Sequence, residues 1–453
     1  MNGGVTGVFR TLWANFKTRR IWRLGGVVAI LCLAVPGLAQ ISTRTTFSDR
    51  FDPIPVAIVP FGGGEPGTRI STVVAADLQR SGYFILLDSA RFPETPDLNT
   101  TPNFEAWWET GARAVLIGRA ANESGRIKAE FRLWNVQSGA QLTGQQFFTA
   151  PAYWRRISHI IADSVYSTMT GLTGFFDTRV AFVDETGPRA NRIKRLAVMD
   201  QDGQNVRYLT QDDSIIVTPR YSPVAQEITF MSQRKAEQPR VQVINLDSGA
   251  RQIVGNFPDM TSSPRFTPDG QRILLSLQQG GDSNIYRLDL ATRTTTRITD
   301  TNAIDTSASS SPDGSRIVFE SDRGGSQQVY VMNSDGSGAE RITFGDGAYS
   351  QPVWSPRGDY IAFVRQKAGV FAVGIIKPDG SGERILAEGF HNEGPTWAPN
   401  GQYLMFFRDS GGEAGGKLIM ADIFGQVEME IPTPSSASDP AWSPLLSTSR
   451  GAY

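Results

Sequence analysis

Pro352-Val353-Trp354-Ser355-Pro356 is the clearest copy of an element that recurs throughout the second half of the chain. The element consists of a proline, an aromatic residue two positions later, a Ser or Thr and a second proline. Its other copies are Pro219–Pro223, Pro264–Pro268 and Pro440–Pro444, with weaker ones at Pro395–Pro399 and Ala308–Pro312. The second proline falls at 223, 268, 312, 356, 399 and 444, so neighbouring copies are 43 to 45 residues apart. A fixed period of this length indicates a repeat architecture.

The same series of strands follows each of the first five copies. After Pro312 come the turn Asp313-Gly314, the alternating strand 316–321, a further strand at 329–332 and a short one at 340–343. Four strands within one such period are typical of the blade of a β-propeller. Because proline cannot donate to a sheet ladder, the two prolines bracket a short inner strand whose aromatic residue can pack between neighbouring blades.

The order of the strands predicts how the ring closes. Residues 179–183 read as the second strand of a blade but precede every copy of the element, whereas no such strand follows the copy at 440–444. The C-terminal inner strand is therefore expected to join the blade that begins near Arg179, which leaves no open edge. We predict a mainly β fold in which a six-bladed β-propeller spans residues 173–448, before a tail at 449–453.

A small α/β domain is predicted for residues 52–172. The pattern gives strands at 56–61, 84–88, 114–119 and 128–135, and helices at 70–80, 104–110 and 153–170. Gly62-x-Gly64-x-x-Gly67 formally matches the dinucleotide-binding fingerprint. Pro66 lies within that loop, however, and the segment has room for only half of a doubly wound sheet. We interpret the glycines as a turn and expect no cofactor.

The N-terminus reads as an export signal. Residues 1–23 carry five basic side chains and no acidic one, an apolar run follows at 24–35, and Pro36-Gly37-Leu38-Ala39 supplies small residues for cleavage. We predict a signal peptide at 1–39, cleaved near Ala39, and a periplasmic protein that does not insert into a membrane afterwards. An uncleaved anchor is the alternative, although the run is shorter than the roughly 20 residues that span a bilayer. The sole cysteine, Cys32, lies inside the signal.

Composition and motifs argue against nucleic-acid binding and catalysis. The 44 basic residues are balanced by 45 acidic ones, which leaves no excess charge for a polyanion. The nucleophile spacing Gly-x-Ser-x-Gly is absent. His159 and His391 have no spaced partner for a metal site or a triad and are interpreted as surface or interdomain residues. Asp200-x-Asp202-Gly203 is interpreted as a hairpin turn. We expect a non-enzymatic protein without a metal.

The loops that lead into the inner strands are the candidate binding site, because they crowd around one mouth of the propeller channel. They mix polar, acidic and apolar side chains, a combination that suits the recognition of a protein. The predicted protein-binding residues of this mouth are Asp213, Ser214, Ile215, Asp259, Met260, Thr261, Ser262, Asp305, Thr306, Tyr349, Ser350, His391, Asn392, Glu393, Ser438 and Asp439.

The chain resembles the periplasmic TolB family of the Tol-Pal cell-envelope system along nearly its whole length. The likeness lies in Val56-Ala57-Ile58-Val59-Pro60-Phe61, in Arg80-Ser81-Gly82-Tyr83-Phe84, in the repeated proline element and in its last copy, Pro440–Pro444. Relatives often carry His-Asn-Gly where this chain has Met260-Thr261-Ser262. The resemblance implies a scaffold that supports outer-membrane integrity and constriction during cell division.

The resemblance also implies two partners and, beyond them, other outer-membrane or periplasmic proteins. The Pal lipoprotein would bind at the propeller mouth, and TolA would bind the extended mature N-terminal segment 40–51. The residues expected to contact TolA are Gln40, Ile41, Ser42, Thr43, Arg44, Phe47, Asp49 and Phe51. Two alternatives stay open: a propeller accessory to a peptidase, and a propeller that binds cell wall or sugar through Trp354, Trp397 and Trp442.

Overall fold

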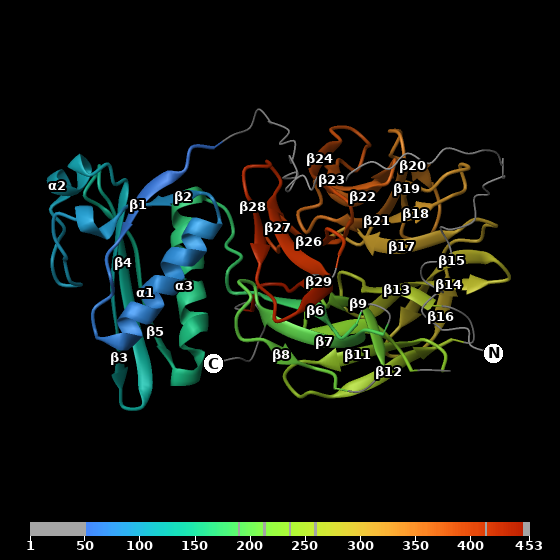
Figure 1. The fold of residues 1–453 in the computed structure, drawn as a ribbon, viewed down its shortest axis with the longest axis horizontal. Coiled ribbons are helices and arrows are strands. Elements are labelled where there is room, and N and C mark those ends of the chain that lie inside the picture. Colours follow the sequence, from blue (N-terminus) through green and yellow to red (C-terminus); the bar gives the residue numbers. More distant parts are fainter. Residues whose placement is uncertain are drawn as a thin grey trace, which may run out of the picture.

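The computed structural model describes residues 51–446, apart from 189–190, 212–213, 235–236, 258–260 and 413–414. The predicted signal peptide, residues 40–50 of the N-terminal segment and the chain after 446 lie outside these ranges. An α/β domain lies beside a larger ring of sheets, as predicted (Figure 1). Among the described helices, none combines the length and the apolarity needed to cross a membrane.

The α/β domain is built on one five-stranded sheet in the order β2-β1-β3-β4-β5. Strand β1 runs parallel to β2 and β3, and β3, β4 and β5 are antiparallel. The strands are β1 Ile54–Ile58, β2 Phe84–Leu86, β3 Ala114–Glu123, β4 Arg126–Asn135 and β5 Gln141–Thr149. The helices are α1 Glu65–Arg80, α2 Phe104–Glu109 and α3 Trp154–Thr170, with 3-10 turns at Ser89–Arg91 and Pro151–Tyr153. Helices α1 and α3 contact each other and the sheet. Strand β5 was not predicted.

The glycines before α1 allow close backbone approach. A Cβ atom on Gly63 would lie 2.1 Å from the carbonyl oxygen of Ala120, and one on Gly67 would lie 2.2 Å from that of Gly62. Gly63 and Gly64 also have φ values of 95° and 83°, which other residues rarely adopt. Packing between this loop and β3 therefore accounts for the glycines, in agreement with the interpretation as a turn.

The propeller consists of six four-stranded sheets, each in antiparallel order from an inner to an outer strand. The first complete blade is β9 Ile215–Tyr221, β10 Glu227–Gln233, β11 Arg240–Asn245 and β12 Arg251–Asn256. The next is β13 Thr261–Phe266, β14 Arg272–Gln279, β15 Asp282–Asp289 and β16 Thr295–Arg297. Then follow β17 Asp305–Ser310, β18 Arg316–Ser321, β19 Gln328–Asn333 and β20 Glu340–Arg341. The fourth is β21 Ala348–Trp354, β22 Ile361–Lys367, β23 Val370–Ile376 and β24 Arg384–Gly389, and the fifth is β25 Asn392–Trp397, β26 Tyr403–Asp409, β27 Gly416–Asp422 and β28 Glu428–Ile431.

The sixth blade closes the ring with strands from both ends of the domain. Strand β29 (Ser436–Trp442) pairs with β6 (Arg179–Thr186), which pairs with β7 (Ile193–Asp200) and then β8 (Arg207–Tyr208). Ala437 lies opposite Asp184, and Trp442 lies opposite Val180. Each of the six inner strands contacts the inner strand on either side, including β29 with β9 and β25. The predicted closure is thus confirmed.

The aromatic residues of the repeated element lie in the core between blades. Trp354, Trp397 and Trp442 are buried together with Tyr221 and Phe266. The indole N–H of Trp397 donates to the carbonyl oxygen of Val353 at 3.0 Å, so even the polar atom of this side chain is used within the propeller. These tryptophans offer no exposed face on which a sugar ring could stack.

The two domains share one apolar cluster. Val74 and Ile161 of the α/β domain belong to the same buried cluster as Met405 and Trp442 of the propeller. The hydroxyl of Tyr403 donates across the boundary to the carbonyl oxygen of Ser81 at 2.7 Å. The end of the propeller opposite the loops that enter the inner strands therefore faces the α/β domain.

Candidate protein-binding site

The mouth of the propeller is formed by two sets of loops. Because the strands of a blade alternate in direction, the loop that enters each inner strand lies at the same end of the blade as the hairpin between its second and third strands. These twelve loops and the adjoining strand ends are called the mouth below. At the other end of each blade, a turn follows the repeated proline element and leads from the first strand to the second; these turns are called the anchor turns below. The contacts with the α/β domain lie at this end of the propeller.

Exposed apolar side chains gather at the mouth. Phe344 is 73% exposed and Phe390 is 57% exposed, and each lies in a loop that enters an inner strand. Ile193, Ile215, Ile304 and Val370 are also exposed at this end of their blades. Elsewhere in the described part of the propeller, the exposed large apolar or aromatic residues are Tyr208, Val224 and Ile253. Apolar groups exposed together on one face are typical of a protein-binding surface.

Several residues predicted to touch a partner are instead buried in structural contacts. Asp305 is fully buried, and both its oxygens accept from Arg323 at 2.8 and 2.9 Å. Tyr349 lies in an apolar cluster, and its hydroxyl donates to Glu383 at 2.9 Å. The amide of Asn392 donates to the carbonyl oxygen of Phe371. These residues lie at the mouth in the sequence, but their side chains are buried. Their contacts hold the loops in place and leave them inaccessible to a partner.

Two further predicted residues, Ser214 and Ser438, are also buried. Ser438 donates to Glu185 at 2.7 Å. A cavity of about 380 Å³ lies beside Ser214 on the blade of β9 to β12. Its other lining residues are Ser232, Arg234, Glu237, Gln238, Arg240, Gln242, Arg251 and Ile253.

The remaining predicted residues are accessible or lie outside the described ranges. Ile215 is exposed, and Ser262, Thr306, Ser350, His391, Glu393 and Asp439 are partly exposed. Asp213, Asp259, Met260 and the side chain of Thr261 are outside the description. His391 lies between the rings of Phe371 and Phe407, with Nε2 3.1 Å from Glu393. The predicted residues include neither Phe344 nor Phe390, although both lie in loops that the repeat pattern locates at the mouth.

Phe51, the one described residue of the predicted TolA-binding segment, lies between the domains. Its ring stacks on Tyr83 of the α/β domain with centroids 3.8 Å apart, and it meets Phe424 of the propeller edge-on at 5.9 Å. Its backbone also exchanges hydrogen bonds with Gln426. The last residue of the predicted segment thus lies at the domain boundary.

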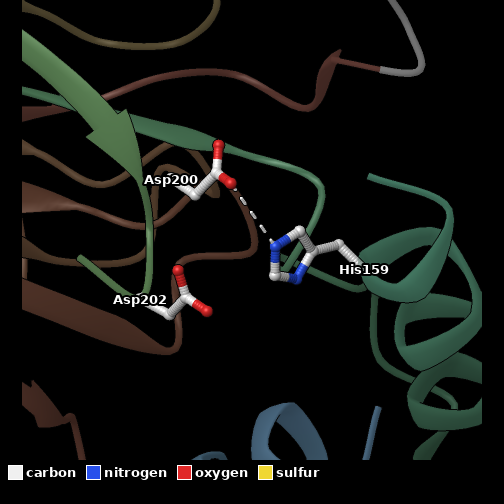
Figure 2. Close-up of side chains that lie close together, drawn as sticks. All are labelled: His159, Asp200 and Asp202. Carbon is white, nitrogen blue, oxygen red and sulfur yellow. Dashed lines mark ion pairs between the residues drawn. The ribbon is translucent and has the colours of Figure 1, made fainter. Parts of the chain in front are cut away.

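A buried polar cluster also joins the two domains, at the end of the propeller that faces the α/β domain. Figure 2 shows His159 of α3 facing Asp200 and Asp202, which lie at and just after the end of β7. Nδ1 of His159 lies 2.6 Å from Asp77 of α1, and its Nε2 lies 3.8 Å from Asp200. Burial opposes the charged form, but the carboxylates of Asp77 and Asp200 outweigh it and raise the pKa of His159 to about 10.

This cluster is an ion-pair network. His159, Asp200 and Asp202 offer ligand atoms within 4.8 Å of one another, the spacing of a metal site. Arg155, however, contacts Asp202 directly and has Nε 3.7 Å from Asp200, and Arg80 lies 3.3 Å from Asp77. Two guanidinium groups and a protonated imidazole thus balance the three carboxylates, which leaves no net negative charge to attract a divalent cation and no free imidazole nitrogen to ligate it. The cluster's chemistry is suited to joining the domains.

Comparison with known proteins agrees with this architecture. Residues 166–446 match the family model described as the TolB beta propeller domain, and residues 47–142 match that of the TolB amino-terminal domain. The crystal structure of TolB from Acinetobacter baumannii is 27% identical, with a TM-score of 0.80 over 89% of this chain and 98% of that one. A putative TolB from Agrobacterium tumefaciens is 18% identical, with a TM-score of 0.47 over 59% and 93%. The family model of the propeller covers more than half of the sequence, and the chain therefore belongs to the TolB family.

Proposed function

We propose that the chain is an exported, non-enzymatic scaffold of the Tol-Pal system in the periplasm. It binds the Pal lipoprotein at the propeller mouth and TolA through the mature N-terminal segment, and it supports outer-membrane integrity and constriction during division. Membership of the TolB family and the predicted signal peptide at 1–39 support this role.

The ring of exposed apolar residues at the mouth carries the proposal. Phe344 and Phe390 extend from loops whose two ends are fixed in sheets, so little conformational entropy is lost when a partner covers them. Beside them, polar groups such as Glu393 are already held in place, here by contacts with His391 and Gln351. Apolar anchors within a polar rim are the usual anatomy of a protein interface.

Loss of the two mouth phenylalanines should abolish most of the Pal affinity. Replacing both Phe344 and Phe390 by Ser removes two exposed apolar anchors, each worth about 2 kcal/mol if it is a hot spot. We expect the dissociation constant for Pal to rise about 100-fold or more in a calorimetric titration. Val224→Ser is the matched control, since Val224 is 59% exposed at the opposite end of its blade. Equal affinities of the double variant and the control would rule out the mouth as the Pal site.

Removal of residues 40–50 should abolish TolA binding and leave Pal binding at the mouth. The deletion retains Phe51, so the stacking on Tyr83 and the contacts with Gln426 remain. An extended polar segment can bind by pairing with the edge of a partner's sheet, and that pairing would be lost. Titrations of the truncated protein with TolA and with Pal measure both effects. Unchanged TolA affinity would disprove the second half of the proposal while leaving the first intact.

A further inference from the structure

Two neighbouring blades depart from the repeat at one position of the inner strand. The residue three positions before the second proline is Ser309, Val353, Thr396 or Ala441 in four blades. In β9 and β13, which contact each other in the ring, it is Arg220 and Arg265. Both arginines lie in the half of their strand away from the mouth.

Two of the four small residues show where a side chain at this position points. The hydroxyl of Ser309 accepts a hydrogen bond from the backbone N–H of Trp354 in the next inner strand at 3.2 Å. Thr396 accepts from the backbone N–H of Trp442 at 3.1 Å in the same way. The position therefore faces the neighbouring inner strand beside the axis. Arginine has no acceptor atom, so Arg220 and Arg265 cannot make this contact between blades.

The two partly exposed guanidinium groups have few partners within the described part of the protein. Arg265 makes no hydrogen bond or ion pair with any described residue, and Arg220 donates only to the carbonyl oxygen of Pro219 at 2.7 Å. Burial lowers the pKa of both groups, and the charge of Arg220 lowers that of Arg265 further. Asp439 on β29 is the acidic group whose charge acts on Arg220. Both side chains are only partly exposed, so two neighbouring cations with so few protein partners repel each other in reduced contact with water, and a bound anion would relieve this repulsion.

The surroundings of these arginines are partly exposed to solvent and hold a further unsatisfied group. Thr218 and Ser263, two residues before each arginine, have positive φ values and are partly exposed, as are Arg220 and Arg265. The hydroxyl oxygen of Thr218 is nonetheless buried without a hydrogen-bond partner. Thr218, Arg220 and Arg265 thus place donor groups on two neighbouring inner strands, β9 and β13.

We propose that Arg220 and Arg265 form a binding site for a carboxylate at the propeller axis. The two arginines and Asp439 leave one positive charge, which a single carboxylate would neutralise. Guanidinium groups bind carboxylates through paired hydrogen bonds, and no donor of Arg265 is used by a described residue. The carboxylate belongs either to a small free acid or to an acidic residue of a bound polypeptide. This site goes beyond the proposed function and does not depend on binding at the mouth.

Thermal unfolding of the mature protein tests the site. Arg265→Ser introduces the residue that Ser309 provides in the next blade, and we expect its Tm without added acid to exceed that of the wild type by about 2 °C or more. Acetate, titrated at ionic strength held constant with chloride, should raise the Tm of the wild type but not that of Arg265→Ser. Arg287→Ser is the matched control from the same sheet, since Arg287 on β15 donates only to the carbonyl oxygen of Ser334; it should keep the acetate response.

A second titration distinguishes the source of the carboxylate. An acetylated, amidated peptide with one glutamate is compared with its glutamine counterpart under the same conditions. A Tm increase with both acetate and the glutamate peptide assigns the site to any accessible carboxylate, and an increase with the peptide alone assigns it to an acidic residue of a polypeptide. No difference between the wild type and Arg265→Ser with either probe would overturn the proposal, as would a lower Tm of Arg265→Ser without ligand.

Discussion

Trp442→Ala should lower the free energy of unfolding by about 4 kcal/mol, because the closing strand loses its largest buried side chain. The indole N–H of Trp442 donates to Thr178 at 2.8 Å, and its ring packs against Phe175 with centroids 6.1 Å apart. The substitution thus removes contacts from the strand that joins the two ends of the propeller. Urea unfolding followed by tryptophan fluorescence measures the loss.

Trp108→Ala is the control for the loss of a tryptophan. Trp108 of α2 is 44% exposed and stacks with Arg113 at the surface, so its loss should cost less than about 1 kcal/mol. If Trp442→Ala cost no more than this control, the closing strand would not contribute to the stability of the ring.

His159→Gln should lower the free energy of unfolding by about 3 kcal/mol near pH 6, since it leaves the carboxylates of Asp77 and Asp200 without their shared cation. The folded protein raises the pKa of His159 from 6.5 to about 10, so it binds this proton more tightly than the unfolded chain does. The stabilisation is therefore fully present below about pH 6.5 and is lost as the pH rises toward about 10.

The difference between wild type and His159→Gln should accordingly shrink between pH 6 and pH 9. Urea unfolding at four pH values in this range measures it. His391→Gln is the matched control, because His391 is partly exposed at the mouth beside Glu393. A wild-type advantage over His159→Gln that stays constant with pH would show that His159 does not carry the charge of the cluster.

The architecture could be predicted because a short pattern of residues recurs at a fixed spacing along the propeller. In five of the six inner strands two prolines flank an aromatic residue that packs in the core, and the second proline is kept in all six, so the period of 43 to 45 residues located six blades. The strand at Arg179 has no copy of the element before it, and the copy at Pro440 has no second strand after it. Together they predicted the pairing of β29 with β6. Strand β5 was missed because Gln141–Thr149 is mostly exposed and has little apolar alternation.

The chemistry of the mouth was harder to predict because burial depends on the neighbouring blade. Tyr349 and Phe344 lie five residues apart at the same end of one blade, yet Tyr349 is buried and Phe344 is exposed. The partner of Asp305 is Arg323, which lies on the far side of β18 in the sequence. No local pattern separates these side chains.

The interdomain cluster required three distant segments to meet. Asp200-x-Asp202-Gly203 does form the predicted hairpin turn, with the N–H of Gly203 donating to the carbonyl oxygen of Asp200 at 3.0 Å. The same turn also presents two carboxylates to His159, and Asp77 reaches this histidine from α1. His159 was expected at a surface or a domain boundary, and the structure places it in the boundary between the two domains.

Hydrogen exchange of the mature protein with and without Pal tests most directly whether the mouth is the site of protein binding. Bound Pal should slow the exchange of backbone amides in the mouth loops around Ile304, Phe344 and Phe390. The anchor turns at the opposite end, such as Asp313-Gly314, should exchange at the same rate in both states. Slower exchange confined to the anchor turns, with the mouth loops unchanged, would contradict the account.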